Sequence, residues 1–353
     1  MKNYIEISKE KFEKLKTKEK VLILAIESSC DETSIALVEN GRNVLSNVIS
    51  TQIDIHKLYG GVVPEIASRN HIKNISTVLD EALETAGKTL SDIDAVAVTY
   101  GAGLVGALLV GVNFAKTLAY SLKVPLIAVS HVHGHIGANY ISHTNLTPPF
   151  LCLMVSGGHT AIVEVKDYCD LHLIGSTVDD SVGECFDKVA RVLGLTYPGG
   201  PNIDRLAKEG EDFVKFNYSS PMKDSYNFSF SGLKTSVVNF VHNKEQKNEE
   251  FSKADVAFSF QEIVTDELCD KAIRACKNLN YNKLVVAGGV GANSRLREKL
   301  QEQCSANGIE VFMPVLKYCT DNAGMIGAIA YYYILNDKGL SDLTLTAKPV
   351  VGI

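Results

Sequence analysis

Residues 21–40, with the sequence VLILAIESSCDETSIALVEN, contain the pattern on which the fold depends. An apolar run ends in a polar turn, and a second apolar run leads to Asn40-Gly41, a dipeptide typical of tight hairpins. Residues 42–50 then predict a third strand. The stretch therefore predicts three hairpin-linked strands, with a polar turn at the end of a buried strand.

The same order of elements returns in the second half of the chain. Residues 150–160, FLCLMVSGGHT, predict a strand that enters a Ser-Gly-Gly turn, and residues 161–165 and 171–177 predict the next two strands. In both halves, helical patterns and further strands follow. A repeat of whole supersecondary units is typical of a duplicated domain. Two such α/β halves that face each other leave a cleft at their strand ends, where ligands bind in open sheets.

Three turns at strand ends are rich in glycine or small polar residues: ESSCDETS, VSGGHT and AGGVGAN, at residues 27–34, 155–160 and 287–293. Exposed backbone amides in such turns suit phosphate oxygens. Neither the Walker pattern nor the dinucleotide pattern GxGxxG is present. One such turn is more often a plain tight turn, but three at equivalent places favour phosphate binding. We therefore expect an α/β protein with the duplicated actin-like ATPase fold of sugar kinases, Hsp70 and actin.

Length and composition indicate a cytoplasmic protein with more than one domain. A chain of 353 residues exceeds one ordinary core. Its eight cysteines form no CxxC pair, which fits a reducing compartment. No signal peptide is evident, and the apolar run 103–115 stops at Lys116, too early to span a bilayer. The net charge of −6 argues against a broad nucleic-acid-binding surface, but leaves a local basic patch or a basic partner open.

We expect three parts along the chain. Residues 1–20 are dense in lysine and are predicted to be a basic, flexible extension without a role in the chemistry. Residues 21–130, together with about 322–345, should form the first α/β domain. Residues 131–321 should form the second.

The segment SHVHGHIGANY, residues 130–140, is a candidate metal site. In a helix, His131 and His135 lie four apart on one face, whereas His133 points elsewhere. Solvated histidines at a helix start are the alternative. The segment YCTDNAG follows a predicted strand, and Thr320 or Asp321 is expected to start a helix there, with an N-cap as the ordinary role of Asp321. Two imidazoles and a carboxylate suit Fe²⁺ or Zn²⁺ with coordination positions left open for substrate.

Nine sequence blocks occur in the order expected of one family. They are IESSCDETS, GGVVPEIASRNH, GLVGALLVG, HVHGH, VSGGHT, GECFDKVARVLGLTYPGGP, FSFSGLKT, VAGGVGANSRLR and CTDNAGMIG. The chain resembles the catalytic subunit of tRNA threonylcarbamoyladenosine synthesis, a family once labelled O-sialoglycoprotein endopeptidase, and looks like a bacterial member. The resemblance covers about Val21 to Leu345.

The resemblance implies the site residues. Its metal ligands would be His131, His135 and Asp321. The residues at its nucleotide or substrate site would be Met154, Val155, Ser156, Gly157, Gly158, Asp187, Gly200, Asp204 and Asn293. A carboxylate such as Asp187 or Asp204 can accept both ribose hydroxyl groups, and Asn293 begins a helix, whose N-terminus favours a negative group. His133 corresponds to a variable position and stays outside the site. Ala102 and Ser130 depart from the residues that are common in the family, and we expect small effects.

The resemblance also implies the reaction. A threonylcarbamoyl group would pass from threonylcarbamoyl-AMP to N6 of the adenosine next to the anticodon, position 37, in tRNAs reading ANN codons. One divalent metal per subunit, with Fe²⁺ favoured and Zn²⁺ as the alternative, would act as a Lewis acid. No protein nucleophile is assigned. ATP, ADP or threonylcarbamoyl-AMP would occupy the cleft. The expected partners are tRNA, a catalytically inert paralogue and a P-loop ATPase, and no membrane.

Three other functions fit the sequence less well. A metalloprotease would carry HExxH, but Val132 and His133 follow His131, so the glutamate is absent. A small-molecule kinase or ATPase of the same fold would need an acidic base beside the transferred phosphate rather than a histidine pair. A nucleotide-switched module like Hsp70 would need a peptide-binding domain, for which too few residues follow the duplicated core.

Overall fold

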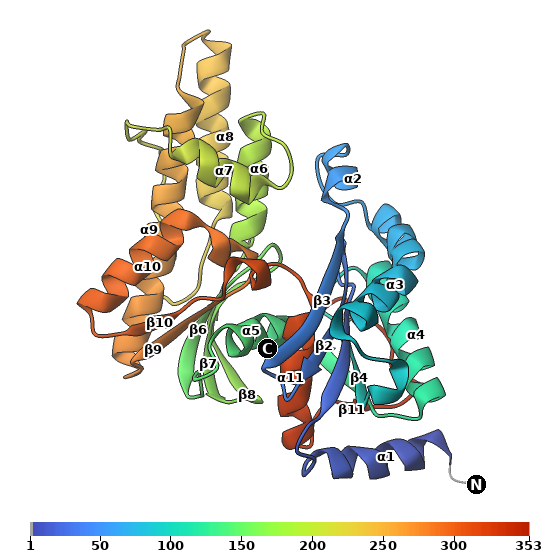
Figure 1. Ribbon diagram of the computed structural model, residues 1–353. Helices are drawn as coiled ribbons and strands as arrows, with labels where there is room; N and C mark the ends of the chain where they lie inside the picture. Colours follow the sequence, from blue (N-terminus) through green and yellow to red (C-terminus); the bar gives the residue numbers. More distant parts are fainter. Residues whose placement is uncertain (1–2, 353) are drawn as a thin grey trace.

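The computed structural model describes residues 3–352, which form two lobes, each built on one β-sheet (Figure 1). The first sheet has six strands in the order β11-β5-β4-β1-β2-β3. Its strands are β1 (Leu22–Glu27), β2 (Glu32–Glu39), β3 (Asn43–Thr51), β4 (Ala95–Gly101), β5 (Leu126–Ser130) and β11 (Leu340–Ser341). β1 pairs with β2 in antiparallel register and with β4 in parallel register. The predicted hairpins of the first half are therefore confirmed.

The second sheet has five strands in the order β10-β9-β6-β7-β8. They are β6 (Phe150–Val155), β7 (Thr160–Asp167), β8 (Asp170–Ser176), β9 (Lys283–Ala287) and β10 (Glu310–Phe312). β6 pairs with β7 in antiparallel register and with β9 in parallel register, as β1 does with β2 and β4. This shared pairing confirms the predicted duplication.

Helices cover the outer face of each sheet. The first lobe carries α2 (Ile53–Lys57), α3 (Pro64–Ala86) and α4 (Val105–Leu122). The second carries α6 (Val182–Val192), α7 (Gly199–Ala207), α8 (Ser231–Gln246), α9 (Lys253–Asn278) and α10 (Ser294–Ala306). Alternate residues of each sheet pack against these helices, in one apolar core per lobe.

Two helices, α5 (His131–Ser142) and α11 (Ala323–Leu335), lie between the sheets and pack against each other (Figure 1). Glycine makes this packing possible, because a Cβ atom on Gly137 would lie 2.6 Å from the carbonyl oxygen of Met325. The inward faces of both sheets join these helices in one shared apolar core. The start of α5 and the segment before α11 are thereby held close together.

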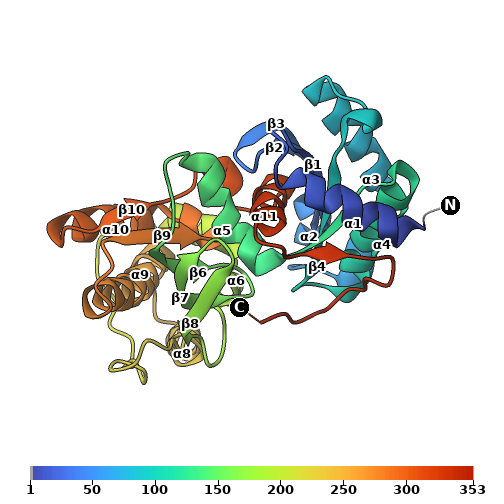
Figure 2. The same cartoon turned by 90° about the horizontal axis from the view of Figure 1, so that it is seen from below.

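The structure corrects the expectation of a flexible extension at residues 1–20. Residues Tyr4–Leu15 form helix α1, which begins with a capping box between Asn3 and Glu6. Phe12 and Leu15, three residues apart on one face, are buried in the shared core, and Figure 2 shows α1 lying along the first lobe. The high lysine content concealed this apolar face. Residues 1 and 2 lie outside the described part.

The structure also changes the expectation for the apolar run near Lys116. Helix α4 continues to Leu122 and, among the described residues, is the one helix long and apolar enough to cross a membrane by length and composition. A core helix passes the same test, and Val112, Ala115 and Ala119 pack into the core of the first lobe.

Candidate metal and nucleotide site

His131, His135 and Asp321 come together where α5 and α11 begin. Both histidines are buried, with their ring centroids 4.6 Å apart, and they lie on one face of α5, as their spacing predicts. Oδ1 of Asp321 lies 3.4 Å from Nε2 of His131 and 3.4 Å from Nε2 of His135. One potential ligand atom from each of the three residues lies within 4.8 Å of the others. The predicted set is therefore a possible metal site.

Asp321 is not the N-cap of α11, which corrects the ordinary role considered for it. The helix begins at Ala323, and the side chain of Asn322 accepts a hydrogen bond from Met325 N. Asn322 therefore satisfies the helix start, and the carboxylate of Asp321 is left to face the two histidines.

The side chains fit a bound divalent cation. Both ring nitrogens of His135 are buried without a hydrogen-bond partner. The 3.4 Å separation from Asp321 is longer than an ordinary N–H···O bond. A buried polar atom without a partner is costly, and a cation at Nε2 would remove that cost. Two imidazole nitrogens and one carboxylate also match the preferences of Zn²⁺ and Fe²⁺, and they leave positions open.

The charged groups at the site shift one another's pKa values. Burial opposes a charge on His131, but Asp321 and Glu27 outweigh it and raise the pKa of His131 to about 9. Burial and the charge of His131 lower the pKa of His135 well below its usual value. Burial raises the pKa of Asp321 to about 6, against the attraction of His131. Without a bound metal, the imidazole of His131 is thus protonated, and its positive charge balances the surrounding carboxylates.

Sequence reasoning missed Glu27, the last residue of β1. Its Oε2 lies 3.1 Å from Nδ1 of His131, on the side of the ring opposite Asp321. The available signal was a carboxylate at the end of a buried strand, in the block IESSCDETS.

The VSGG turn presents backbone rather than side chains. Met154 and Val155 are wholly buried in β6, so their side chains belong to the core. Gly157 and Gly158 have open space where a Cβ atom would lie. Helix α6 begins beside them, because a Cβ atom on Gly183 would lie 2.7 Å from the carbonyl oxygen of Ser156. A helix N-terminus beside an open glycine turn suits an anionic group.

The remaining predicted residues fall into two pairs. Oδ1 of Asp187 accepts a hydrogen bond from Gly199 N at 2.7 Å, and Gly200 follows directly, with open space at its Cβ position. Burial raises the pKa of Asp187. Asp204 accepts a hydrogen bond from Ser294 Oγ at 2.8 Å, which places it beside Asn293.

The side chain of Asn293 is largely committed within the protein. Its Oδ1 caps α10 by accepting from Leu296 N at 2.9 Å, and its Nδ2 donates to Gln261 Oε1 at 2.7 Å. The helix start is confirmed. However, one of the two amide hydrogens, which are the groups that could donate to an anion, is already used by Gln261.

Two segments of the first lobe contact the second lobe. In the turn after β1, Oδ2 of Asp31 lies 3.4 Å from the hydroxyl of Tyr197, and between α2 and α3 the carbonyl oxygen of Gly60 accepts from Nη2 of Arg191 at 2.5 Å. Burial raises the pKa of Glu32 well above its usual value, and the nearby charges of Asp31 and Asp321 add to the shift. Two further carboxyl groups, not assigned from sequence, therefore lie where the lobes meet.

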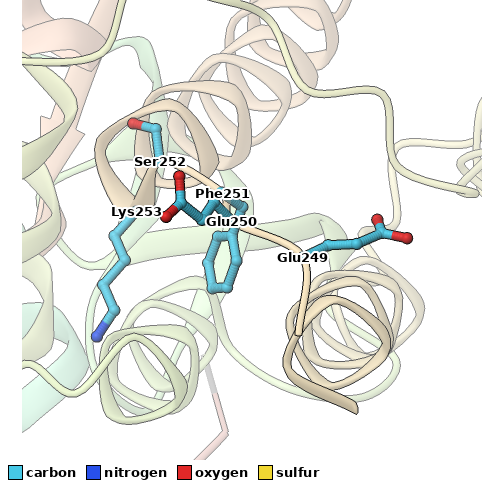
Figure 3. A pocket seen from close by; sticks show the side chains of 5 residues that line it. All are labelled: Glu249, Glu250, Phe251, Ser252 and Lys253. Atoms are coloured by element: carbon cyan, nitrogen blue, oxygen red, sulfur yellow. The ribbon is translucent and has the colours of Figure 1, made fainter. Parts of the chain in front are cut away.

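Two surface hollows lie away from these residues. One, of about 520 Å³, is lined by Glu249–Lys253 in the loop between α8 and α9; in Figure 3 the side chains of Glu249 and Lys253 point to opposite sides. The other, of about 590 Å³, lies between α3 and α4. Neither hollow contains a predicted site residue, so neither is the candidate site.

Comparison with known proteins identifies the family of this chain. Residues 43–328 match the family described as tRNA N6-adenosine threonylcarbamoyltransferase. A protein of that name from Clostridium perfringens is 57% identical over 332 residues, which cover 94% of this chain and 98% of the relative. One from Clostridium botulinum is 55% identical over 333 residues, with 94% and 98% covered.

Solved structures share the fold. HypF from T. kodakarensis matches with a TM-score of 0.61 and 14% identity, over 92% of this chain and 49% of HypF. Component A of (R)-2-hydroxyglutaryl-CoA dehydratase from Acidaminococcus fermentans matches with a TM-score of 0.53 and 14% identity, over 90% and 98%. These neighbours have the actin-like ATPase fold, as predicted. The relatives match nearly the full length of this chain, which is therefore an enzyme, a transferase that modifies tRNA. It belongs to the tRNA N6-adenosine threonylcarbamoyltransferase family.

Proposed function

We propose that this chain transfers a threonylcarbamoyl group from threonylcarbamoyl-AMP to N6 of adenosine 37 in tRNAs reading ANN codons. The observation that carries the proposal is the cluster of His131, His135 and Asp321 at the junction of the lobes. A cation site on one lobe and an open glycine turn on the other would together suit an acyl adenylate, whose reacting carbonyl and phosphate groups need a Lewis acid and an anion site.

The three cluster residues would hold one divalent cation, Fe²⁺ in preference to Zn²⁺. When bound, that cation supplies Lewis-acid stabilisation of oxygens that gain negative charge as AMP leaves. The residues themselves present two imidazole nitrogens from buried histidines and one carboxylate oxygen from the half-buried Asp321. The burial of the histidines keeps water away and strengthens the electrostatic interactions of the site.

The adenylate would lie between the lobes. The amides at Gly157 and Gly158 and the start of α6 would receive its phosphate, while Asp187, Gly200 and Asp204 would lie beside the nucleoside. Ser156 shapes the turn, because its amide donates to the carbonyl oxygen of His159 at 2.8 Å. HypF, which shares the fold, has been solved in a phosphate- and nucleotide-bound form.

The adenine amine would itself be the nucleophile, so the chain needs no nucleophilic side chain. Cys30, which lies next to Asp31, is the thiol closest in sequence to the interlobe carboxylates. Burial raises its pKa well above the usual value, and the charges of Asp31 and Asp321 add to the shift. It is therefore a protonated thiol at neutral pH and a poor nucleophile.

The proposed assembly includes tRNA, an inert paralogue and a P-loop ATPase, in the cytoplasm. The paralogue would cover the hollow between α3 and α4, where Ile72 is 65% exposed beside Leu109 and Phe114. A chain of net charge −6 has little means of binding tRNA phosphates alone. We also propose that residues 21–130, together with about 322–345, form one domain and that residues 131–321 form the other.

The test supplies threonylcarbamoyl-AMP and matching tRNA at fixed salt, with and without the two partner proteins. We expect weak tRNA binding and slow modification by the chain alone, and repeated turnover with an ATP requirement when both partners are present. Rapid turnover by the chain alone would contradict the partner proposal but not the transfer. Absence of modified adenosine under every condition, with phosphorylation of a small molecule instead, would favour a kinase.

A further inference from the structure

We propose that Glu27 is a positioning residue for the metal site, which holds His131 in the tautomer whose Nε2 is free to bind the cation. This inference rests on the metal site of the proposed function and goes beyond it. Glu27 does not belong to the ligand set among the described residues. It acts through His131, from the opposite side of the ring.

The contacts of Glu27 leave it few alternatives. It is fully buried at the end of β1. Its Oε1 accepts from Ser29 N at 2.6 Å, and its Oε2 accepts from Thr99 Oγ1 at 2.6 Å. The same Oε2 lies 3.1 Å from Nδ1 of His131, which also lies 3.1 Å from Ser29 Oγ.

Both oxygens of Glu27 already accept hydrogen bonds, from Ser29 N and Thr99 Oγ1, so Glu27 acts as an acceptor and its contact with His131 requires a proton on Nδ1. In a neutral imidazole, the other nitrogen then carries the lone pair. That nitrogen is Nε2, which faces Asp321 at 3.4 Å. The order carboxylate, imidazole, cation is how metal-binding histidines are commonly fixed in orientation and made more basic.

Glu27 owes its position to the first sheet. It ends β1, Thr99 lies in β4, and these two strands pair in parallel, with Ile26 opposite Val98. His131 follows β5, which pairs with β4. Three neighbouring strands therefore place the carboxylate, its hydroxyl donor and the histidine close together, near the C-terminal ends of these strands.

His135 provides an internal contrast. Among the described residues, neither of its ring nitrogens has a hydrogen-bond partner, so no neighbour there selects its tautomer. His131 is therefore the ligand whose ring Glu27 orients: with the Nδ1 proton held by Glu27, the proton that a cation displaces is the one on Nε2.

The substitution Glu27→Gln separates this role from a purely structural one. A glutamine oxygen can still accept from Ser29 N, so the turn keeps that bond. The amide NH₂ group then lies against Nδ1 of His131 and donates to it, which forces the proton onto Nε2. The ring would present an N–H group where the cation needs a lone pair.

The experiment measures the Zn²⁺ dissociation constant of the full chain without tRNA, by competition with a chelator. We expect Glu27→Gln to weaken Zn²⁺ binding about 10- to 100-fold, the usual cost of losing such a partner. Thr99→Val is the matched control, because it removes a donor to Glu27 and leaves the Glu27–His131 contact in place. Its Zn²⁺ affinity should stay within about threefold of the wild-type value.

A second measurement reads the tautomer directly. In the Zn²⁺-loaded wild-type protein labelled with ¹⁵N-histidine, His131 should carry its proton on Nδ1; His131→Ala identifies its signals. Wild-type Zn²⁺ affinity in a folded Glu27→Gln protein would overturn the inference. If that variant fails to fold, an Nε2-protonated His131 in the wild-type protein would overturn it equally. By contrast, full Zn²⁺ binding by His131→Ala would refute the proposed metal site itself.

Discussion

The two lobes carry the same turn in two chemical versions. In the first lobe, β1 ends at Glu27 and the turn that follows contains Asp31, and in the second lobe the turn between β6 and β7 contains Gly157 and Gly158. The first turn is crowded with hydrogen bonds that involve carboxylates, and it supports His131. The second leaves open space in front of its glycines. In the proposed function, the first lobe is therefore the metal-supporting half of the duplicated frame, and the second lobe is its anion-accepting half.

The first position of the second strand shows the same divergence. In the first lobe, this position is Glu32, whose carboxyl group is held near Asp31 and Asp321. In the second lobe, it is Thr160, whose Oγ1 accepts from Val182 N at 2.8 Å and so ties the strand to α6. Thr160 contributes to packing, whereas Glu32 lowers the stability of the folded protein, as ionisable residues at functional sites commonly do.

The largest expected effect concerns the metal-supporting half. His131→Ala, His135→Ala or Asp321→Ala should each remove most bound metal and lower transfer activity by at least about 100-fold, because a three-ligand site has no spare ligand. Metal analysis and the transfer assay check this. His133→Ala is the control: its Nδ1 lies 2.6 Å from the Tyr333 hydroxyl, outside the cluster, and metal content should be unchanged. Full metal content in His131→Ala would refute the assignment.

A smaller effect is expected in the anion-accepting half. Gly158→Ala should fold normally, because its Cβ meets no atom within 4 Å, but it should weaken AMP binding about tenfold, or about 1.4 kcal/mol. Gly183→Ala should instead lower the melting temperature, because its Cβ would meet Ser156 O at 2.7 Å. Calorimetry with AMP and thermal melting distinguish them. Unchanged AMP affinity in Gly158→Ala would mean that the turn does not receive the phosphate.

The smallest expected effect is on stability, at Glu32. Its pKa is raised in the folded protein, so the folded state binds more protons than the unfolded state above the ordinary pKa of about 4.5. The contribution of Glu32 to stability therefore falls as pH rises through that window. Glu32→Gln should melt higher than the wild-type protein at pH 7, and the difference should vanish near pH 4. Equal melting temperatures at both pH values would contradict the raised pKa.

Local patterns were sufficient where neighbours in sequence decide the structure. The hairpin at Asn40-Gly41 lies where predicted, between β2 and β3, because turn chemistry acts over a few residues. The four-residue spacing of His131 and His135 likewise places both rings on one face of α5. The repeat of strand order, read from the chain, correctly predicted the duplicated sheets.

Contacts between distant segments depend on the tertiary structure alone. Asp321 reaches the histidines because α5 and α11 pack through Gly137, and Glu27 reaches His131 because β1, β4 and β5 are neighbours in one sheet. Phe12 is likewise buried by residues of the shared core that lie far from α1 in the sequence. Spacing along a chain specifies which face a residue occupies, but which faces meet depends on burial and close packing of the whole molecule.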